Sequence, residues 1–387
     1  MMMAMRKQIW LVVVALLCTQ GSWAEEEDSR QVPTSFVRDV MQPLGMPTVT
    51  FFHAIRENLF LNTKLKHPNP LERIGNFFLI PSQYLFAGKK ISFTDENTVE
   101  IKQAYSYRKW HAFKSLLCLA ALPVSETLGI TFKGLSFLSS DVRKKHRAAK
   151  IALTTPSTSN LDLYRSQGVS SFHTDEFIPC LDLKRPSKLT KKQKIELQAL
   201  KDVMELLDAH QVLYWIDCGT ALGAYRYGGI IPWDWDIDLS IILSDHDLVK
   251  QILSNLDPEK YQIQDWSSYS NPKTFMKLYV KETKNFVDIY HYQIHEKEGT
   301  MSYFFTYENS PFPHSWKAEE LKCMKPLKIE EIFPLKQARF DGLVVRAPHD
   351  IVTFLQSKYG ENLSPVMAWI EETQTFEKVL DHPYWRR

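Results

Sequence analysis

The stretch that decides the fold is Trp215–Ser240, which reads WIDCGTALGAYRYGGIIPWDWDIDLS. The apolar run that leads into it, Val212–Ile216, is short and bounded by polar residues, which is typical of a buried strand. After a Gly-Thr break we expect a short helix, Ala221–Tyr227, with Thr220 as its N-cap and a glycine pair at its end. A strand, a turn and a helix therefore precede the acidic part of the stretch.

A second strand, Ile230–Leu243, is predicted to follow the helix. It carries aspartates at every second position: Asp234, Asp236 and Asp238. Side chains alternate between the faces of a strand, so these carboxylates would share one face while Trp235 and Ile237 face a core. Neighbouring carboxylates repel each other, and a bound divalent cation removes that repulsion. Oxygen-rich ligand sets suit hard ions, so the pattern predicts a site for Mg²⁺ or Mn²⁺.

The turn before the helix predicts a second kind of ligand. The backbone amides of Gly219 and Thr220 would lie at a helix N-terminus, where free N–H groups and partial positive charge favour phosphate. A phosphate site beside a metal site indicates phosphoryl or nucleotidyl transfer. Two other interpretations are a solvated acidic loop, which the flanking apolar residues disfavour, and an EF-hand loop. The EF-hand requires glycine at its sixth position, which here is Leu239.

Asp288, later in the chain, is a further candidate for the metal site. Thr274–Val280 and Asn285–Tyr292 read as two strands around a turn, and Asp288 lies inside the apolar second strand. Burying a lone carboxylate is costly, so Asp288 needs a partner. It is either a buried hydrogen-bond acceptor or the third carboxylate of the metal site, opposite Asp236 and Asp238.

Further elements follow from periodicity and capping signals. We expect a helix capped by Thr190, a helix through Ser244–Leu253, a strand over Phe340–Ala347 and a helix over His349–Tyr359.

Length and composition describe a globular chain in more than one part. The chain has 387 residues, of which 44% are hydrophobic and 24% charged, enough for one large domain or two ordinary ones. The formal charge of +2 gives no electrostatic argument for nucleic acid as a partner. We divide the chain into a targeting segment at 1–24, a mostly helical region of unknown role at 25–180 and a catalytic domain at 181–387. The Ser/Thr-rich stretch Thr154–Asn160 is a candidate linker.

The N-terminus resembles a secretory signal. Arg6 and Lys7 precede an apolar segment, Ile9–Cys18, and Ser22–Ala24 places small residues where a signal peptidase reads them. The apolar segment is short for a membrane span. We therefore expect cleavage before Glu25 and an exported or secretory-pathway protein, with an uncleaved N-terminal anchor as the alternative.

Another apolar run lies in the N-terminal region. Leu116–Val124 is interrupted by Pro123 and short, which favours a buried helix over a spanning one, with attachment at a membrane interface as the alternative. The basic run Arg143–Arg147, with Lys150 beyond it, is either a solvated helix end or a binding site for anionic lipid. Peripheral membrane association is therefore one possible partner interaction.

The central stretch resembles the signature of the LicD family, which includes bacterial phosphocholine transferases, fukutin and fukutin-related protein. The similarity rests on Gly219–Gly223, Arg226, Gly229 and Ile231–Asp238. Later features agree in order: Val287–Ile289, Phe333–Pro334, Phe340 with Gly342, and Pro348 followed by Tyr359–Gly360. The resemblance implies an α/β (α+β) domain with a nucleotidyltransferase-like mixed sheet flanked by helices, preceded here by an extra, mostly helical region.

The resemblance also implies a reaction. Members transfer a phosphorylated small group, of phosphocholine or phospho-alditol type, from a CDP-linked donor to a hydroxyl of a glycan or glycoconjugate acceptor. The expected metal ligands are Asp234, Asp236, Asp238 and Asp288, and the last three are the expected catalytic residues. The expected phosphate-binding residues are Gly219, Thr220, Arg226 and Lys277. The alternatives are a glycosyltransferase that uses a D-x-D metal site for a nucleotide sugar, and a non-catalytic binding protein on a decayed transferase scaffold.

Overall fold

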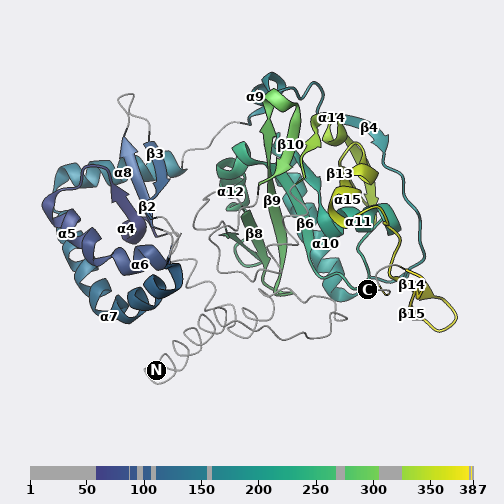
Figure 1. The fold of residues 1–387 in the computed structure, drawn as a ribbon, viewed down its shortest axis with the longest axis horizontal. Coiled ribbons are helices and arrows are strands. Elements are labelled where there is room, and N and C mark those ends of the chain that lie inside the picture. Colours follow the sequence, from purple (N-terminus) through teal and green to yellow (C-terminus); the bar gives the residue numbers. More distant parts are fainter. Residues whose placement is uncertain are drawn as a thin grey trace. The chain divides into compact units, whose positions relative to one another are not determined.

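The computed structural model describes residues 58–86, 88–93, 99–105, 110–154, 159–266, 275–304, 325–382 and 385 (Figure 1). The chain divides into two compact units, with the division between Thr155 and Pro156. Unit 1 contains the described residues before this point, and unit 2 contains those after it. The predicted signal at 1–24 lies outside the described residues.

Unit 1 combines helices with a small sheet. Its elements are α4 (Leu59–Asn62), β1 (Thr63–Leu65), α5 (Pro70–Phe78), α6 (Ile80–Leu85), β2 (Lys89–Phe93), β3 (Val99–Gln103), α7 (His111–Ser136) and α8 (Ser140–Thr154). Strand β2 pairs in parallel with β1 and antiparallel with β3. Leu65, Ile91 and Ala149 form a buried cluster, against which Phe93 packs. Residues from the sheet and α8 thus make this small core.

Helix α7 packs closely on α5 through polar as well as apolar contacts. A Cβ on Gly75 of α5 would lie 2.6 Å from the backbone nitrogen of Lys133, so glycine permits the close approach. The Lys133 side chain is fully buried and donates to the Thr63 carbonyl and to Asn76 Oδ1, the latter at 2.9 Å. A buried ammonium is tolerated only with such partners, so this lysine fixes α7 to the rest of unit 1.

The expectation of a short, buried helix at Leu116–Val124 is wrong. Helix α7 has 26 residues and continues through Pro123. Within its segment Phe113–Ser136, an 18-residue window has a mean hydropathy of 1.6, and only 6% of that window is buried. A proline removes one helix hydrogen bond, and the apolar residues around it have high helix propensity. Within the described residues, α7 is the one helix long and apolar enough to cross a membrane, by length and composition alone.

Unit 2 is built on a seven-stranded mixed sheet. Its strands are β5 (Tyr214–Ile216), β6 (Ile237–Ile242), β7 (Tyr261–Asp265), β8 (Phe275–Val280), β9 (Asn285–His295), β10 (Thr300–Tyr303) and β11 (Leu327–Lys328). The long strand β9 is central: β6 pairs in parallel along one edge, and β8 and then β10 pair antiparallel along the other. Every residue of β6 and β8 is buried, so both faces of the sheet are covered there.

The remaining elements of unit 2 surround this sheet and form two smaller ones. The helices are α9 (Leu161–Ser166), α10 (Lys191–Ala209), α11 (Cys218–Tyr227), η1 (Leu243–Asp245), α12 (His246–Leu253), η2 (Glu296–Glu298), α14 (Ile329–Ile332) and α15 (Ile351–Tyr359). The strands are β4 (His173–Phe177), β12 (Leu335–Phe340), β13 (Leu343–Ala347), β14 (Met367–Ile370) and β15 (Thr375–Lys378). The predicted α+β class, a mixed sheet with flanking helices, is confirmed.

Local sequence signals predicted the start of α10 correctly but not the turn between β12 and β13. Thr190 caps α10, forming a capping box with Gln193. The predicted single strand over Phe340–Ala347 is wrong, because Asp341 and Gly342 adopt positive φ angles of 50° and 85° and turn the chain between β12 and β13. Strand β4, from the region assigned to 25–180, pairs in parallel with β12 of unit 2.

Candidate active site

The aspartates do not share one strand, so that interpretation is wrong. Strand β6 begins at Ile237, and only Asp238 lies on it. The preceding segment turns instead, because Pro232 has no amide hydrogen for a ladder and the Asp234 amide donates to the Ile231 carbonyl at 2.8 Å. Asp234 and Asp236 therefore lie on the connection that enters β6.

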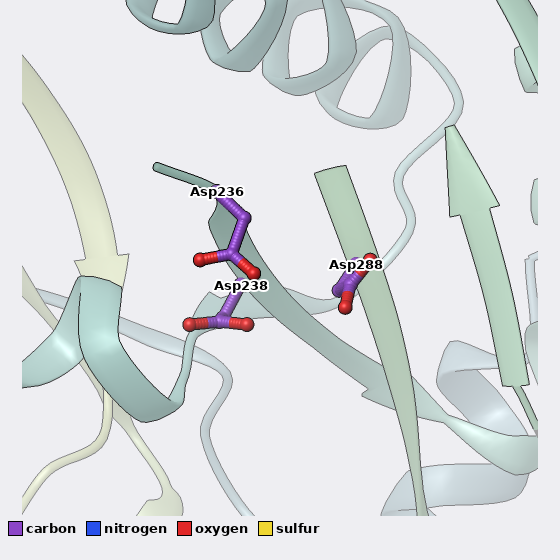
Figure 2. A group of neighbouring side chains, drawn as sticks. All are labelled: Asp236, Asp238 and Asp288. Carbon is purple, nitrogen blue, oxygen red and sulfur yellow. The ribbon is translucent and has the colours of Figure 1, made fainter. Parts of the chain in front are cut away.

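The fold nevertheless brings three of the four predicted metal ligands together, and Asp234 lies outside this group. In the β6–β9 register Asp238 lies opposite Asp288, and in the β8–β9 register Lys277 lies opposite Asp288. One carboxylate oxygen each from Asp236, Asp238 and Asp288 lies within 4.8 Å of the others. Figure 2 shows Asp236 and Asp238 at the start of β6 and Asp288 on the neighbouring strand. A set of carboxylate oxygens this close matches the ligands that Mg²⁺ and Mn²⁺ prefer.

The N-terminus of α11 is fastened to Asp238. The Asp238 amide donates to Thr220 Oγ1 at 2.8 Å, and the Gly219 amide donates to Asp238 Oδ2 at 3.0 Å. Thr220 is therefore not the N-cap as predicted: α11 starts at Cys218, whose amide donates to its N-cap, Asp217. In this structure the Cys218 and Gly219 amides donate hydrogen bonds to the carboxylates of Asp217 and Asp238. The partial positive charge of the helix end therefore stabilises the acidic cluster.

Glycine is required at position 219 by crowding. A Cβ there would lie 2.4 Å from Asp234 Oδ2 and 3.3 Å from Asp238 Oδ2. Any larger residue would push the carboxylates away from the helix end. The Gly-Thr break, which was predicted to bind phosphate, thus sets how closely α11 approaches the aspartates.

The carboxylates are hard to ionise together. Burial, reinforced by the neighbouring carboxylates, raises the pKa of Asp236 and of Asp238 well above its ordinary value. Burial also raises the pKa of Asp234. For Asp288 burial again raises the pKa, but the charge of Lys277 and its hydrogen bonds act in the opposite direction. A bound cation would relieve this repulsion, so the residues present fit a divalent metal.

Lys277, which was predicted to bind phosphate, pairs with Asp288 in this structure. Its ammonium donates to both oxygens of Asp288, at 2.8 and 2.7 Å, and lies over the rings of Phe275 and Phe286. Asp288 is therefore both a buried acceptor and a neighbour of the other carboxylates. The interpretation as a buried acceptor is confirmed by the hydrogen bonds from Lys277, and the interpretation as a metal ligand stays a prediction.

Arg226, predicted to bind phosphate, is engaged by the backbone of the C-terminal segment. Its Nε donates to the Leu363 carbonyl and its Nη2 to the Ser364 carbonyl, both at 2.7 Å. The side chain is buried, and burial lowers its pKa. In this structure Arg226 fixes the C-terminal segment to α11.

A buried ion pair that the sequence analysis missed lies beneath the acidic cluster. Asp217 accepts hydrogen bonds from Cys218 N and Ser240 Oγ, both at 2.5 Å, and pairs with Lys358 Nζ at 2.9 Å. The side chains of Asp217 and Lys358 are 0% and 2% exposed. The amphipathic pattern of α15 gives no signal for Lys358, whereas an acid directly after the buried strand β5 was a signal for Asp217.

A shallow pocket opens beside the cluster, between the start of α10 and the segment that enters β6. It is lined by Thr190, Lys192, Gln193, Glu196, Ile230, Pro232, Trp233, Asp234, Trp235 and Asp236. Trp233 is 41% exposed, and its ring meets the edge of Phe376 at 5.0 Å between centroids. The pocket combines aromatic surface with two of the aspartates.

The raised pKa values predict an unusual pH dependence in metal-free protein. When the folded-state pKa of an acid is raised, stability falls as pH rises above the ordinary value, which is 3.8 for aspartate. In chelator, Asp238→Asn should therefore gain melting temperature relative to the native chain as pH increases from about 4 to about 8. Asp162→Asn, at a side chain 97% exposed, is the control. If the melting temperature of the variant relative to the native chain stays constant or falls across this pH range, the proposed repulsion among the carboxylates is contradicted.

The Asp217–Lys358 pair should be critical for stability. Lys358→Met leaves the Asp217 carboxylate buried without its cation, which typically costs about 3–5 kcal/mol. Urea unfolding of the native chain and the variant measures this loss. Lys184→Met, at a side chain 77% exposed and 4.0 Å from Glu371, should cost less than about 1 kcal/mol. Similar small losses in both variants would show that the buried pair is unimportant.

Comparison with known proteins agrees with this geometry. Residues 211–350 match the family described as LicD/FKTN/FKRP, nucleotidyltransferase domain. An uncharacterized protein of Rickettsia typhi is 30% identical over 175 residues, which cover 45% of this chain and 48% of that protein. The human ribitol 5-phosphate transferase FKRP is 29% identical over 175 residues, 42% of this chain and 32% of that protein. The mouse ribitol-5-phosphate transferase FKTN is 26% identical over 164 residues, 41% of this chain and 31% of that protein. The chain thus spans about half the rickettsial protein and about a third of each transferase, and its residues 211–350 are similar to the nucleotidyltransferase domain of the LicD family.

Proposed function

We propose that this protein is a metal-dependent phosphotransferase that moves a phosphorylated alditol, of the ribitol phosphate type, from a CDP-linked donor to a glycan hydroxyl. The observation that carries the proposal is the convergence of Asp236, Asp238 and Asp288 beside the N-terminus of α11. The relatives FKRP and FKTN are ribitol 5-phosphate transferases, which supports the choice of an alditol phosphate over phosphocholine. The predicted signal at 1–24 supports action in the secretory pathway.

Asp236 and Asp238 would hold Mg²⁺ or Mn²⁺. Asp234 lies outside that group, but its side chain interacts with Asp236, so it would orient Asp236 or add a ligand. When bound, the metal supplies positive charge to the phosphate oxygens of the donor. The Gly219 turn sets the spacing of the carboxylates, and α11 places its positive end against them. Positioning and charge neutralisation carry most of the catalysis in phosphoryl transfer.

Asp288 is the proposed base for the acceptor hydroxyl. A base must be ionised before it can take a proton, and burial disfavours ionisation because it raises the pKa of Asp288. Lys277 counteracts burial through its two hydrogen bonds, so it keeps the carboxylate available. Lys277 would therefore favour the ionised form of Asp288, which is the form that can accept a proton.

The pocket beside Asp236 is the proposed acceptor site. The indole rings of Trp233 and Trp235 offer flat apolar surface, which suits the faces of sugar rings, and the polar residues of α10 line the opposite wall. An acceptor bound there would lie next to the aspartate cluster.

Asparagine variants test the assignment of roles. Asp236→Asn and Asp238→Asn should abolish turnover and strongly weaken Mn²⁺ binding measured by titration calorimetry. Asp234→Asn should lose on the order of 10–100-fold, the range for an orienting partner. Asp288→Asn should retain Mn²⁺ binding but lose turnover, since its main task is the acceptor proton. Asp162→Asn, an exposed aspartate, is the matched control and should behave as the native protein. Equal, small effects in all four site variants would favour the decayed-scaffold alternative.

A donor panel tests the reaction itself. The purified protein is incubated with Mn²⁺, a glycan acceptor and either CDP-ribitol, CDP-glycerol, CDP-choline or a nucleotide sugar, with mass detection of the product. We expect a mass increase of one alditol phosphate from CDP-ribitol, lost in Asp238→Asn. Transfer of phosphocholine would change the donor class, and transfer of a sugar without phosphate would establish the glycosyltransferase alternative.

A further inference from the structure

Helix α7 presents an apolar stripe to its surroundings. Its exposed large apolar residues are Phe113, Leu116, Leu117, Val124, Leu128, Ile130 and Leu135. Most of them recur three, four or seven residues apart, so they lie on one side of the helix. The most exposed of these residues is Val124, at 71%. No described part of the chain covers this stripe.

The polar residues of α7 are arranged in the opposite way from those of a water-facing helix. Glu126 and Lys133 follow Val124 by two and nine residues, about half a turn around the helix, and Lys133 is fully buried inside unit 1. On the exposed side, Thr127 and Thr131 donate to helix carbonyls four residues earlier, at 3.1 and 2.8 Å. Their hydroxyls are therefore satisfied without water.

Helix α5 extends the apolar surface. Leu71, Ile74 and Phe77 are three residues apart and are 37%, 41% and 65% exposed. The next residue, Phe78, stacks on Phe132 of α7, with ring centroids 6.0 Å apart. The apolar surfaces of α5 and α7 are thus connected through this aromatic pair.

Charged and aromatic groups lie at both ends of α7. Trp110, directly before it, is 74% exposed. Helix α8 begins at Ser140 and exposes cationic side chains: Arg143, Lys144, Arg147 and Lys150. Tryptophan and basic residues beside an apolar surface are typical of segments at a membrane interface.

We propose that unit 1 binds a lipid bilayer, with the α5–α7 surface (Leu71, Ile74, Phe77 and the α7 stripe) among the acyl chains and the α8 cations against anionic headgroups. Only one side of α7 is apolar, while its other side holds the polar contacts to unit 1. A helix of this kind lies in the membrane surface rather than crossing the bilayer. The proposal is independent of the transferase site.

Vesicle flotation tests the proposal on the full-length chain. The protein is made by cell-free synthesis with vesicles of phosphatidylcholine, alone or mixed with phosphatidylserine, and the fraction floating with the lipid is measured. Val124→Glu places a charge on the stripe. Two matched variants make the same change elsewhere: Val344→Glu, at a 56% exposed residue of unit 2, and Val13→Glu, in the predicted signal. The uncharged variant Val124→Ser and a melting curve of each variant show whether a loss of flotation comes from a folding defect.

We expect the native chain to float with vesicles that contain phosphatidylserine. Val124→Glu should reduce the floating fraction at least about 10-fold, the ratio that a loss of 1.4 kcal/mol produces. Val124→Ser should reduce it less, and Val344→Glu and Val13→Glu should float as the native chain does. Lys144→Gln with Arg147→Gln should weaken flotation on anionic vesicles. Failure of the native chain to float, or loss in Val13→Glu with full flotation of Val124→Glu, would overturn the proposal.

Discussion

The repulsion among buried carboxylates where the chain enters β6 is the constraint on which unit 2 depends. Strand β9 pairs in parallel with β6 and adds Asp288 to the acidic cluster, and β8 then adds Lys277 beside Asp288. The end of α11 directs backbone amides at the same charges, and Gly219 allows the approach. One lysine does not balance four carboxylates, and the proposed divalent cation would supply the missing positive charge. The metal-dependent transfer proposed here follows from that imbalance.

Beneath the cluster, the Asp217–Lys358 pair joins the start of α11 to α15. Asp217 also binds Ser240 of β6, so one carboxylate connects three elements that form the floor of the site. Burying such a pair is energetically costly, so we infer that the pair serves to hold α11, α15 and β6 in position. Unit 1 uses a buried lysine in a comparable way, because Lys133 holds α7 in the orientation that exposes its apolar stripe.

The sequence was sufficient for the features that depend on local pattern. The closely spaced aspartates and Asp288 in its apolar strand predicted the acidic cluster, although the aspartates do not share one strand, and Thr190 predicted the start of α10. The features it did not provide depend on contacts between distant residues. Arg226 is bound by carbonyls more than a hundred positions away, and nothing local marks Lys358 as a partner of Asp217. The composition of α7 likewise did not reveal which side would remain exposed.

The central claim is that Asp236 and Asp238 hold one divalent metal ion, with the carboxylate of Asp288 beside it. Crystals soaked in Mn²⁺ and a cytidine diphosphate, with diffraction data collected at a wavelength where manganese scatters anomalously, test it most directly. The account predicts an anomalous peak bonded to oxygens of Asp236 and Asp238, with Asp288 beside it and Lys277 still paired to Asp288. A peak elsewhere in unit 2, or an acidic cluster without manganese in crystals that bind the nucleotide, would contradict the account.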